Sequence, residues 1–411
     1  MRTNTILTQV LGIEKTRVCN VAFDEGKLLL TVRPTTRAPR CGSCTRACRK
    51  VHDRRRRRWR HLDVFGVQCW LQAELRRVRC SRCGVTTEAV PWAAHATGFT
   101  YAFEQTVAFL AQRADKTAVS TMMRVSWETV GLVAARVVER SQLCDPLDGL
   151  RNISVDELSW RKHHRYITVV IDQDRGHVVW AAPGKDAKTL LSFFQQLGKD
   201  RAELIRTVSA DLSGAFTKAI KEACPKATIV YDRFHVQRLA HDALDSVRRE
   251  EVRGAEDAEA KSIKHTRWAL QKNPWNMSAV DSSKLRDVQR DNKRLYRAYL
   301  LKEVLAAVLD RQQPNVAREK LLDWCAWAAR SQLAPFRRVA KTIKQHLDGI
   351  VAYVRTGLSN GRHEGLNGKA RTITRRSYGF HSPHALIGLI MLCCTGLVLM
   401  PAFHAALPPK G

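Results

Sequence analysis

The sequence predicts a multidomain α/β protein, and three observations support this fold class. The chain has 411 residues, enough for two to four folding units with sizeable cores. From residue 152 to 231, β-branched runs alternate with helical patterns, and helical patterns alone follow from 233 to 354. Two Cys-x-x-Cys pairs near the N-terminus are typical of a small metal-binding module.

The composition indicates a polyanionic partner. The chain has 69 Lys and Arg against 39 Asp and Glu, a formal net charge of +30. This excess favours nucleic acid, because Lys and Arg displace the counterions condensed on phosphate backbones. A hydrophobic fraction of 45% excludes a mostly disordered chain. A basic membrane-surface protein is the alternative, but no basic amphipathic helix is obvious in the sequence.

The cellular compartment decides how the twelve cysteines are interpreted. The first ten residues are polar and lack an apolar signal core, so we expect the reducing cytoplasm, where disulfides are rare. The most apolar run, 385–400, has 16 residues, fewer than the roughly 20 that a membrane-spanning helix needs. This run is expected to be a buried helix, and no membrane partner is predicted.

The paired cysteines predict a structural zinc site. The tight turn of each Cys-x-x-Cys pair points two thiolates at one tetrahedral ion, and a hairpin is expected in the long loop between the pairs. The four expected ligands are Cys41, Cys44, Cys80 and Cys83, with Cys48 as a substitute. Two turns with free thiols are the alternative. The other cysteines are expected in the core: Cys19, Cys69, Cys144, Cys224, Cys325, Cys393 and Cys394.

The most basic region of the chain includes the loop between the two cysteine pairs. Residues 33–82 contain 16 Lys and Arg and three acidic residues. The residues predicted to bind DNA are Arg54, Arg55, Arg56, Arg57, Arg58, Trp59 and Arg60. Five successive arginines cannot all face one groove, so they suit phosphate contacts, which position a protein without reading base sequence. A solvated charged surface is the alternative.

A helix-turn-helix is predicted after the zinc module. Helical patterns cover 103–113, 117–123 and 127–140. Ser126 is the expected N-cap of the third helix. A short helix, a tight turn and a longer helix are typical of this DNA-binding motif, in which Trp127, Glu128 and Arg136 would face DNA. An ordinary helical hairpin is the alternative.

A mixed sheet is predicted after a turn-rich linker at 146–151. The expected order is β-β-β-α-β-α-β, with the first strand just before Asp156. The later elements are expected at 166–172, 176–180, 186–197, 204–209, 213–223 and 227–231. Residues 233–354 are helical by pattern and predict a long helical insertion, because a structureless segment of that length is implausible in a compact domain.

Three acidic residues are candidates for a catalytic metal site. Asp156 and Asp211 lie at strand ends, and Glu364 lies near the start of a late helix. Convergent carboxylates repel one another and need divalent cations between them; hard oxygen ligands suit Mg²⁺, and Mn²⁺ would fit as well. Arg371 follows Glu364 by two helical turns and is expected to bind the phosphate. Each acid by itself is also compatible with a turn or a helix cap.

Four sequence blocks carry a resemblance to a known family. They are Ser-Val-Asp-Glu at 154–157, Val-Ser-Ala-Asp-Leu-Ser-Gly-Ala-Phe at 208–216, Tyr-Asp-Arg-Phe-His at 231–235 and Ser-Asn-Gly-Arg-His-Glu-Gly-Leu-Asn at 359–367. With the paired cysteines, the helix-turn-helix and Gly379-Phe380, they resemble the ISL-three (ISL3) family of bacterial insertion-sequence transposases. The resemblance covers nearly the whole chain. The family often has Asp-Met-Ser-x-x-Tyr at the second block, a departure that nearly conserves side-chain volume.

The resemblance implies a ribonuclease-H-like catalytic domain with a large helical insertion before its last acid. It implies a DDE triad of Asp156, Asp211 and Glu364, none of which is replaced. Asp232 also matches a family block, and with His235 it is expected to order the sheet edge rather than to bind metal. The expected domains are the zinc module (1–97), the helix-turn-helix (98–148), the first catalytic part (149–239), the helical insertion (240–354) and the last catalytic part (355–411).

The expected function is transposition by phosphoryl transfer. The enzyme would hydrolyse the ends of its own element and join the freed 3′-hydroxyls to a target strand. Its partners would be double-stranded DNA, both terminal inverted repeats and target, and synapsis of two ends favours a homodimer or larger assembly at the bacterial nucleoid. Two alternatives stay open: a zinc-containing DNA-binding repressor without catalysis, and a structure-specific nuclease on the same fold.

Overall fold

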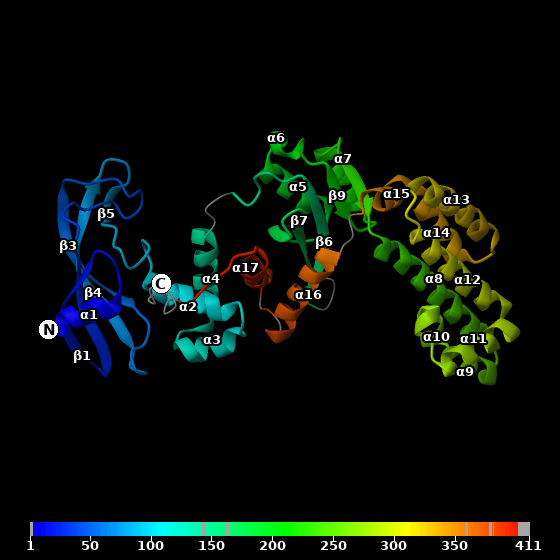
Figure 1. Cartoon of the computed structure of the whole chain (residues 1–411), viewed down its shortest axis with the longest axis horizontal. Helices are drawn as coiled ribbons and strands as arrows, with labels where there is room; N and C mark the ends of the chain where they lie inside the picture. Colours follow the sequence, from blue (N-terminus) through cyan, green and yellow to red (C-terminus); the bar gives the residue numbers. More distant parts are fainter. Residues whose placement is uncertain are drawn as a thin grey trace, which may run out of the picture. The chain divides into compact units, whose positions relative to one another are not determined.

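The computed structural model describes residues 3–141, 145–161, 165–357, 361–377, 380 and 382–401; the side chains of 258, 361–364 and 367 lie outside this description. Figure 1 shows the helices and strands of the chain. The chain divides into two units. The first unit comprises Met1–Leu143, Arg375–Tyr378 and Gly388–Gly411. The second unit comprises Cys144–Thr374 and Gly379–Ile387. Each unit has its own hydrophobic core, so each is described separately.

A five-stranded sheet begins the first unit, in the order β1-β2-β4-β3 with β5 paired to β4. The elements are α1 (Thr3–Leu11), β1 (Thr16–Asp24), β2 (Lys27–Pro34), β3 (Val51–Arg60), β4 (Cys69–Cys80) and β5 (Gly84–Thr87). The hairpin expected between the cysteine pairs is confirmed, because β3 and β4 pair antiparallel. Alternate side chains of β4, among them Leu71 and Leu75, form the core together with Trp59 and Trp92.

The cysteines outside the paired motifs follow the prediction with one exception. The expectation that Cys19 lies in the core is wrong, because β1 has a register shift between Val18 and Asn20 that leaves Cys19 in an exposed bulge. The buried ones are Cys69, Cys224, Cys325, Cys393 and Cys394. Cys144 lies outside the described residues.

Three helices follow the sheet and confirm the predicted helical pattern. They are α2 (Tyr101–Ala111), α3 (Lys116–Met123) and α4 (Trp127–Ser141). Asp115 caps α3 by accepting two backbone N–H groups. Ser126 Oγ accepts the N–H of Thr129 at 3.2 Å, as expected of the N-cap of α4. Between the two helices Arg124 adopts the left-handed conformation (φ 53°), which ends α3 and turns the chain tightly.

The C-terminal segment lies against these helices, in the first unit. The side-chain amide of Gln112 donates to the carbonyl of Leu392 at 2.8 Å, and the Arg376 guanidinium donates to the carbonyl of Ala111 at 2.7 Å. These bonds satisfy backbone carbonyls at the end of α2 and in the C-terminal segment. The predicted last domain, 355–411, is therefore divided between the two units instead of lying wholly in the catalytic one.

The second unit contains a mixed five-stranded sheet in the order β10-β9-β6-β7-β8. Its strands are β6 (Asn152–Arg161), β7 (Arg165–Asp172), β8 (His177–Pro183), β9 (Thr207–Ala210) and β10 (Thr228–Tyr231). Strands β6, β7 and β8 form an antiparallel meander, and β9 and β10 run parallel to β6. The predicted order of strands and helices is confirmed.

Helices α5 (Ala187–Leu197) and α7 (Gly214–Ala223) cover one face of this sheet. Their apolar stripes, which include Leu190, Phe193 and Phe216, pack on Val155 and Val208 of the strands. The strand expected from residue 204 begins only at Thr207, because the short helix α6 (Lys199–Ala202) and its closing turn occupy the preceding residues.

The long segment after β10 folds as a helical insertion with its own core. Its helices are α8 (Arg233–Gly254), α9 (Asp257–Lys264), α10 (Arg267–Gln271), η1 (Pro274–Asn276), α11 (Ala279–Asp291), α12 (Lys293–Leu309), α13 (Pro314–Arg330), α14 (Ala334–Gln345) and α15 (Leu347–Thr356). The predicted insertion is therefore helical as expected. Its predicted start at residue 240 falls inside α8, which runs without a break from the end of the sheet.

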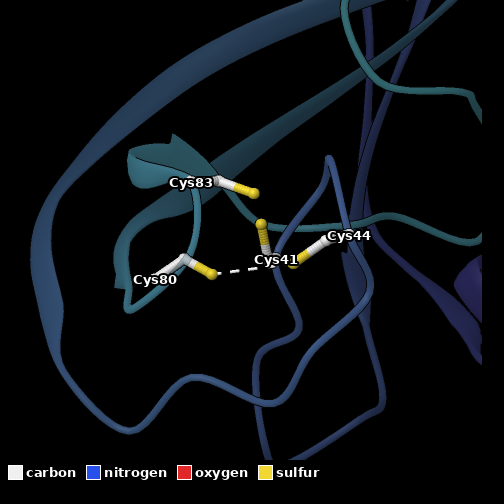
Figure 2. Close-up of side chains that lie close together, drawn as sticks. All are labelled: Cys41, Cys44, Cys80 and Cys83. Atoms are coloured by element: carbon white, nitrogen blue, oxygen red, sulfur yellow. Dashed lines mark hydrogen bonds between the residues drawn. The ribbon is translucent and has the colours of Figure 1, made fainter.

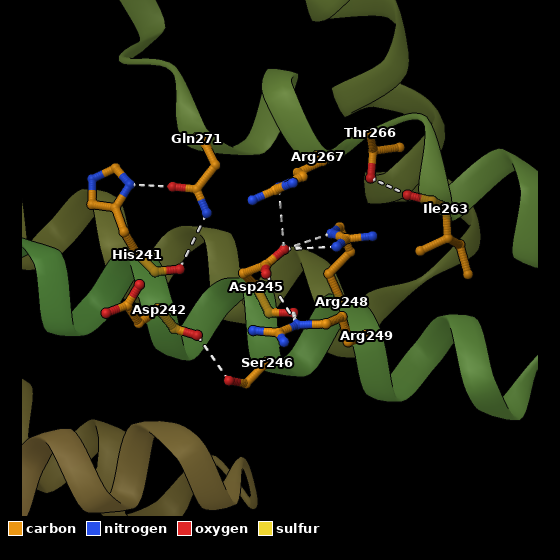
Figure 3. Close-up of polar contacts among 10 residues, drawn as sticks. All are labelled: His241, Asp242, Asp245, Ser246, Arg248, Arg249, Ile263, Thr266, Arg267 and Gln271. Carbon is orange, nitrogen blue, oxygen red and sulfur yellow. Dashed lines mark hydrogen bonds and ion pairs between the residues drawn. The ribbon is translucent and has the colours of Figure 1, made fainter. Parts of the chain in front are cut away.

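Polar contacts fix α10 on α8 within the insertion, as Figure 3 shows. The carboxylate of Asp245 forms ion pairs with the guanidinium groups of Arg248, Arg249 and Arg267. The side-chain amide of Gln271 donates to the backbone carbonyl of His241 at 3.1 Å. One carboxylate thus neutralises part of the positive charge that three arginines bring together.

Two helices end the described chain, α16 (Gly361–Arg376) and α17 (Pro383–Cys394). The apolar run 385–400 is helical and largely buried up to Cys394, as predicted for a buried helix. Within the residues that the structure describes, no helix combines the length and apolarity needed to cross a membrane.

Candidate functional site

The four predicted zinc ligands lie together in the first unit. Their sulfur atoms all lie within 4.8 Å of one another. Figure 2 shows Cys41 and Cys44 on one loop and Cys80 and Cys83 on the turn between β4 and β5, with the sulfurs facing a common centre. This is the donor set and arrangement of a closed structural zinc site. Cys48 packs beside this group in the same cluster but is not one of the four.

The local electrostatics show why these thiols need a cation. Backbone N–H groups of Arg82 and Cys83 lower the pKa of Cys80 to about 6. In contrast, the hydrogen bond that the Cys83 thiol donates to Cys44 and burial raise the pKa of Cys83 to about 12. Four sulfurs this close cannot all ionise unless a metal ion balances their charge. The site therefore fits a structural Zn²⁺ ion.

The predicted arginine run forms the edge strand β3. Arg54, Arg55, Arg56 and Arg58 are exposed, and Arg57 is half-buried against the ring of Trp59. Arg54 pairs with Glu74 and Arg58 with Asp24. Among the described residues no acidic group pairs with Arg55 or Arg56. These two cations are therefore the most available phosphate ligands of the strand.

The prediction that Trp59 and Arg60 bind DNA is wrong, because both side chains are buried. Trp59 is 1% exposed and belongs to the sheet core, and Arg60 is 3% exposed. Arg60 forms an ion pair with Asp63 and donates to the carbonyl of Cys69. In the sequence these residues form one continuous basic run. The run gives no sign that β3 passes from the surface into the core at its C-terminal end.

The helix-turn-helix residues have mixed environments. Trp127 lies at the start of α4, half-buried, with the ammonium group of Lys116 4.2 Å from its ring centroid. The Arg136 guanidinium pairs instead with the fully buried carboxylate of Glu104 at 2.8 Å, as does Arg140 at 2.7 Å. Arg136 thus fastens α4 to α2, a structural role that the sequence pattern did not predict.

Two of the predicted catalytic acids are aligned by strand register in the second unit. Ser154 of β6 lies opposite Ser209 of β9 in a parallel pair, so Asp156 and Asp211, each two residues further on, lie at the same level. Since side chains of a strand alternate with a period of two, Asp156 lies on the same side of the sheet as Ser154, and Asp211 directly follows the last residue of β9. The opposite side carries the core formed with α5 and α7.

A third acid and a histidine adjoin Asp211. Tyr231 of β10 lies opposite Ala210 of β9, which brings Asp232 level with Asp211. His235, in the first turn of α8, has its Nδ1 3.2 Å from the carboxylate of Asp211. The expectation that Asp232 and His235 order the sheet edge is thus compatible with their positions, and the contact of His235 with a predicted metal ligand is new.

Glu157 is a further acid near this site, which the sequence analysis did not single out as functional. Burial raises its pKa, Lys185 lowers it, and the carboxylates of Asp211 and Asp156 raise it. A half-buried carboxyl group within electrostatic range of two others marks a place where negative charge accumulates. Its position next to Asp156 in the Ser-Val-Asp-Glu block was the only signal in the sequence.

The remaining predicted catalytic residues belong to α16. Glu364 lies in this helix, but its side chain lies outside the described residues. Arg371 is exposed on the same helix. The prediction that Asp156 lies at a strand end is wrong, because β6 continues past it to Arg161, whereas Asp211 directly follows β9. The approach of Glu364 to these two acids stays a prediction.

Comparisons with known proteins agree with this architecture. A family model for ISL3 DDE elements, described as a transposase, matches residues 153–390. A model described as the zinc-finger of transposase IS204/IS1001/IS1096/IS1165 matches residues 37–83. One described as the helix-turn-helix domain of transposase family ISL3 matches residues 88–138. The three matches follow the order of the zinc site, the α2–α4 helices and the mixed sheet.

Whole-length relatives give the same result. The transposase for insertion sequence element IS1557 of Mycobacterium tuberculosis is 40% identical over 430 residues, covering 96% of each protein. The transposase for insertion sequence element IS1001 of Bordetella parapertussis is 30% identical over 362 residues, covering 87% of this chain and 89% of the relative. The chain therefore belongs to the ISL3 family of insertion-sequence transposases, with a zinc ribbon and a helix-turn-helix ahead of its DDE domain.

Proposed function

We propose that this enzyme cuts the ends of its own insertion sequence and joins them to target DNA, with Asp156, Asp211 and Glu364 as its catalytic carboxylates. The observation that supports the proposal is the parallel pairing of Ser154 in β6 with Ser209 in β9, since Asp156 and Asp211 each follow these serines by two residues. Family membership supplies the reaction class, which is phosphoryl transfer on DNA.

The three carboxylates would hold Mg²⁺ or Mn²⁺, since oxygen donors suit these hard cations. When bound, such ions activate the attacking oxygen and stabilise the leaving one in line. The chain's own contribution is to fix the ligands. The backbone N–H of Leu212 donates to the Asp211 carboxylate at 2.6 Å, and His235 approaches the same carboxylate from α8. The carboxylate is thus oriented before DNA binds.

Arg371 is proposed to contact a phosphate of the bound DNA. It follows Glu364 by seven residues on α16, a rise of about 10.5 Å along the helix axis. Its guanidinium group is exposed and offers planar, paired donors that match phosphate oxygens.

The first unit is proposed to bind the terminal inverted repeats. Arg55 and Arg56 on β3 would contact phosphates, and Trp127 at the start of α4 would approach the bases. Synapsis of two element ends favours a homodimer or a larger assembly. Since the substrate is bacterial DNA, we place the enzyme at the nucleoid.

A strand-transfer assay tests this proposal. Purified protein is incubated with DNA that carries the element's ends, with Mg²⁺ or with EDTA, and wild type is compared with Asp211→Asn and Glu364→Gln. Joined products that need the metal and both carboxylates are the expected result. Cleavage without joining would point to a nuclease, and end binding with neither reaction, unaffected by both substitutions, would point to a repressor.

A further inference from the structure

Helix α14 (Ala334–Gln345) belongs to the helical insertion (Figure 1). Its residues form one strongly apolar and one strongly basic side. Its apolar side chains Phe336, Val339 and Ile343 are buried in the insertion core. The side chains on its solvent side are exposed, and four of them are cations: Arg337, Arg338, Lys341 and Lys344. We call these four residues the α14 basic face.

The basic face lacks the acidic partners that accompany cations elsewhere in the insertion. Helix α14 contains no Asp or Glu, whereas α8, α9, α11, α12, α13 and α15 each contain at least one. On α13, Arg318 pairs with Asp348 and Lys320 with Asp323. No acidic group among the described residues pairs with any member of the basic face. Its charge is therefore directed to solvent and uncompensated.

The support beneath this face is rigid. The ring of Phe336 lies 6.5 Å from that of Trp324 on α13, and the Cys325 thiol donates to the carbonyl of Ala340 at 3.6 Å. Trp324 is itself anchored by its indole N–H, which donates to the carbonyl of Leu301 at 2.9 Å. The cations therefore project from a fixed helix and need little ordering when they bind a ligand.

We propose that the α14 basic face binds the phosphate backbone of duplex DNA, which gives the helical insertion a role in holding DNA. The four cations span about 10.5 Å along the helix. Duplex DNA carries one negative charge per about 1.7 Å of its axis, so several phosphates lie within reach of this face. Contacts to phosphates alone position DNA without selecting sequence, so the bound segment can be flanking or target DNA. The inference rests on the proposal that DNA is the substrate, but not on the catalytic carboxylates.

The test compares two variants of the full-length protein that lose the same charge. The first carries Arg337→Gln, Arg338→Gln, Lys341→Gln and Lys344→Gln. The matched control carries Arg290→Gln, Arg294→Gln, Arg318→Gln and Lys320→Gln, whose cations lie in the same insertion but are all ion-paired. Affinity for a duplex without element ends is measured by fluorescence anisotropy over a series of salt concentrations.

We expect the basic-face variant to bind the duplex at least about tenfold more weakly, with a salt slope reduced by about two to four. The control should keep its slope within about one of wild type. Equal slopes for both variants would overturn the proposal. A basic-face variant with unchanged DNA affinity but a changed oligomeric mass would also overturn the proposal. That result would mean that the α14 basic face contacts a second copy of the chain.

A chemical footprint on the wild-type protein keeps the test valid if a variant misfolds. Duplex DNA should protect Lys341 and Lys344 from acetylation, as read by mass spectrometry, while Lys320 on α13 stays reactive. Equal reactivity of all three lysines with and without DNA would contradict the inference. If DNA protects Lys341 and Lys344 but the protein shows no strand transfer, the α14 basic face still binds DNA and only the proposed reaction is contradicted.

Discussion

At the scale of single residues, the structure shows which groups contact the carboxylate of Asp211, a proposed catalytic residue. Asp211 is 43% exposed, and its oxygen lies 3.2 Å from Nδ1 of His235, which is only 17% exposed. A half-buried imidazole that contacts a metal-ligating carboxylate can fix the orientation of that carboxylate. His235 is therefore a positioning residue that acts through Asp211.

His235→Ala should lower strand transfer by about 10- to 100-fold, because the Asp211 carboxylate loses its orientation. End binding should be unchanged, since His235 lies in α8 of the second unit. The metal concentration that gives half-maximal activity should rise. His241→Ala is the control, because His241 lies on the same helix but contacts Gln271. Equal losses for both variants would mean a general defect of α8 instead of a role at Asp211.

A buried histidine in the first unit predicts acid sensitivity. Burial and then the Arg60 charge lower the pKa of His61 from 6.5 to about 4. The native state thus binds a proton less readily than the unfolded state, so stability is complete above pH 6.5 and is lost as the pH falls toward 4. The loss should be on the order of 2–3 kcal/mol.

His61→Gln should remove most of this pH dependence of the first unit. Pulse proteolysis in urea between pH 7 and pH 4.5 reports the unfolding of each unit through its own fragments. The control is His52→Gln, since His52 is exposed on β3. A wild-type midpoint in urea that does not change over this range would contradict the prediction.

At the scale of elements, the zinc loops and the strand between them depend on each other. Cys80 ends β4, and Cys41 lies on the loop that forms an isolated bridge to Glu88 beyond β5. The loops themselves contribute few apolar side chains, so the metal supplies much of the stability of this end of the sheet.

Cys80→Ser should lose zinc and unfold the N-terminal module. Zinc content is measured by mass spectrometry of the purified protein, and unfolding by hydrogen exchange in β4 and β5. Cys48→Ser should keep the metal, because Cys48 lies beside the four ligands and is not one of them. Full zinc content in the Cys80→Ser variant would refute the four-cysteine assignment.

The exposed side of β3 should make sequence-independent contacts. Arg55→Ala should weaken binding to all duplexes similarly and reduce the salt slope by about one. Arg17→Ala, at an exposed position of β1 on the opposite edge of the sheet, is the control and should leave the slope unchanged. A loss confined to one DNA sequence, with the salt slope unchanged, would argue against a phosphate contact.

At the scale of the whole molecule, the net charge of +30 is spread over modules in both units. The exposed arginines of β3 lie in the first unit, and the α14 basic face lies in the second. Two separate basic surfaces let one protomer hold more than one DNA segment, which strand transfer between an element end and a target requires.

Synapsis predicts an assembly that depends on paired ends. DNA that carries two element ends should sediment with at least two protomers, whereas a duplex with one end should bind without bridging. Analytical ultracentrifugation with labelled DNA measures both. A single protomer on two-ended DNA, in a preparation active in strand transfer, would contradict the expected homodimer or larger assembly.

Local sequence signals were sufficient to predict the zinc ligands, the helix-turn-helix and the order of strands in the catalytic sheet. These features follow from local signals: cysteine spacing, caps such as Ser126, and β-branched runs such as 166–172. Each signal involves residues that are close in the chain, so it can be recognised without knowledge of the fold. The family blocks added the proposed catalytic triad of Asp156, Asp211 and Glu364.

The availability of individual side chains, in contrast, depends on the folded chain. Trp59 and Arg60 are buried because β3 ends in the sheet core, and Arg136 is occupied by Glu104, 32 residues away in sequence. The level of Asp156 with Asp211 depends on the pairing of β6 with β9, strands that are far apart along the chain. Burial, ion pairing and strand register are long-range properties, so residue type and spacing alone do not determine them.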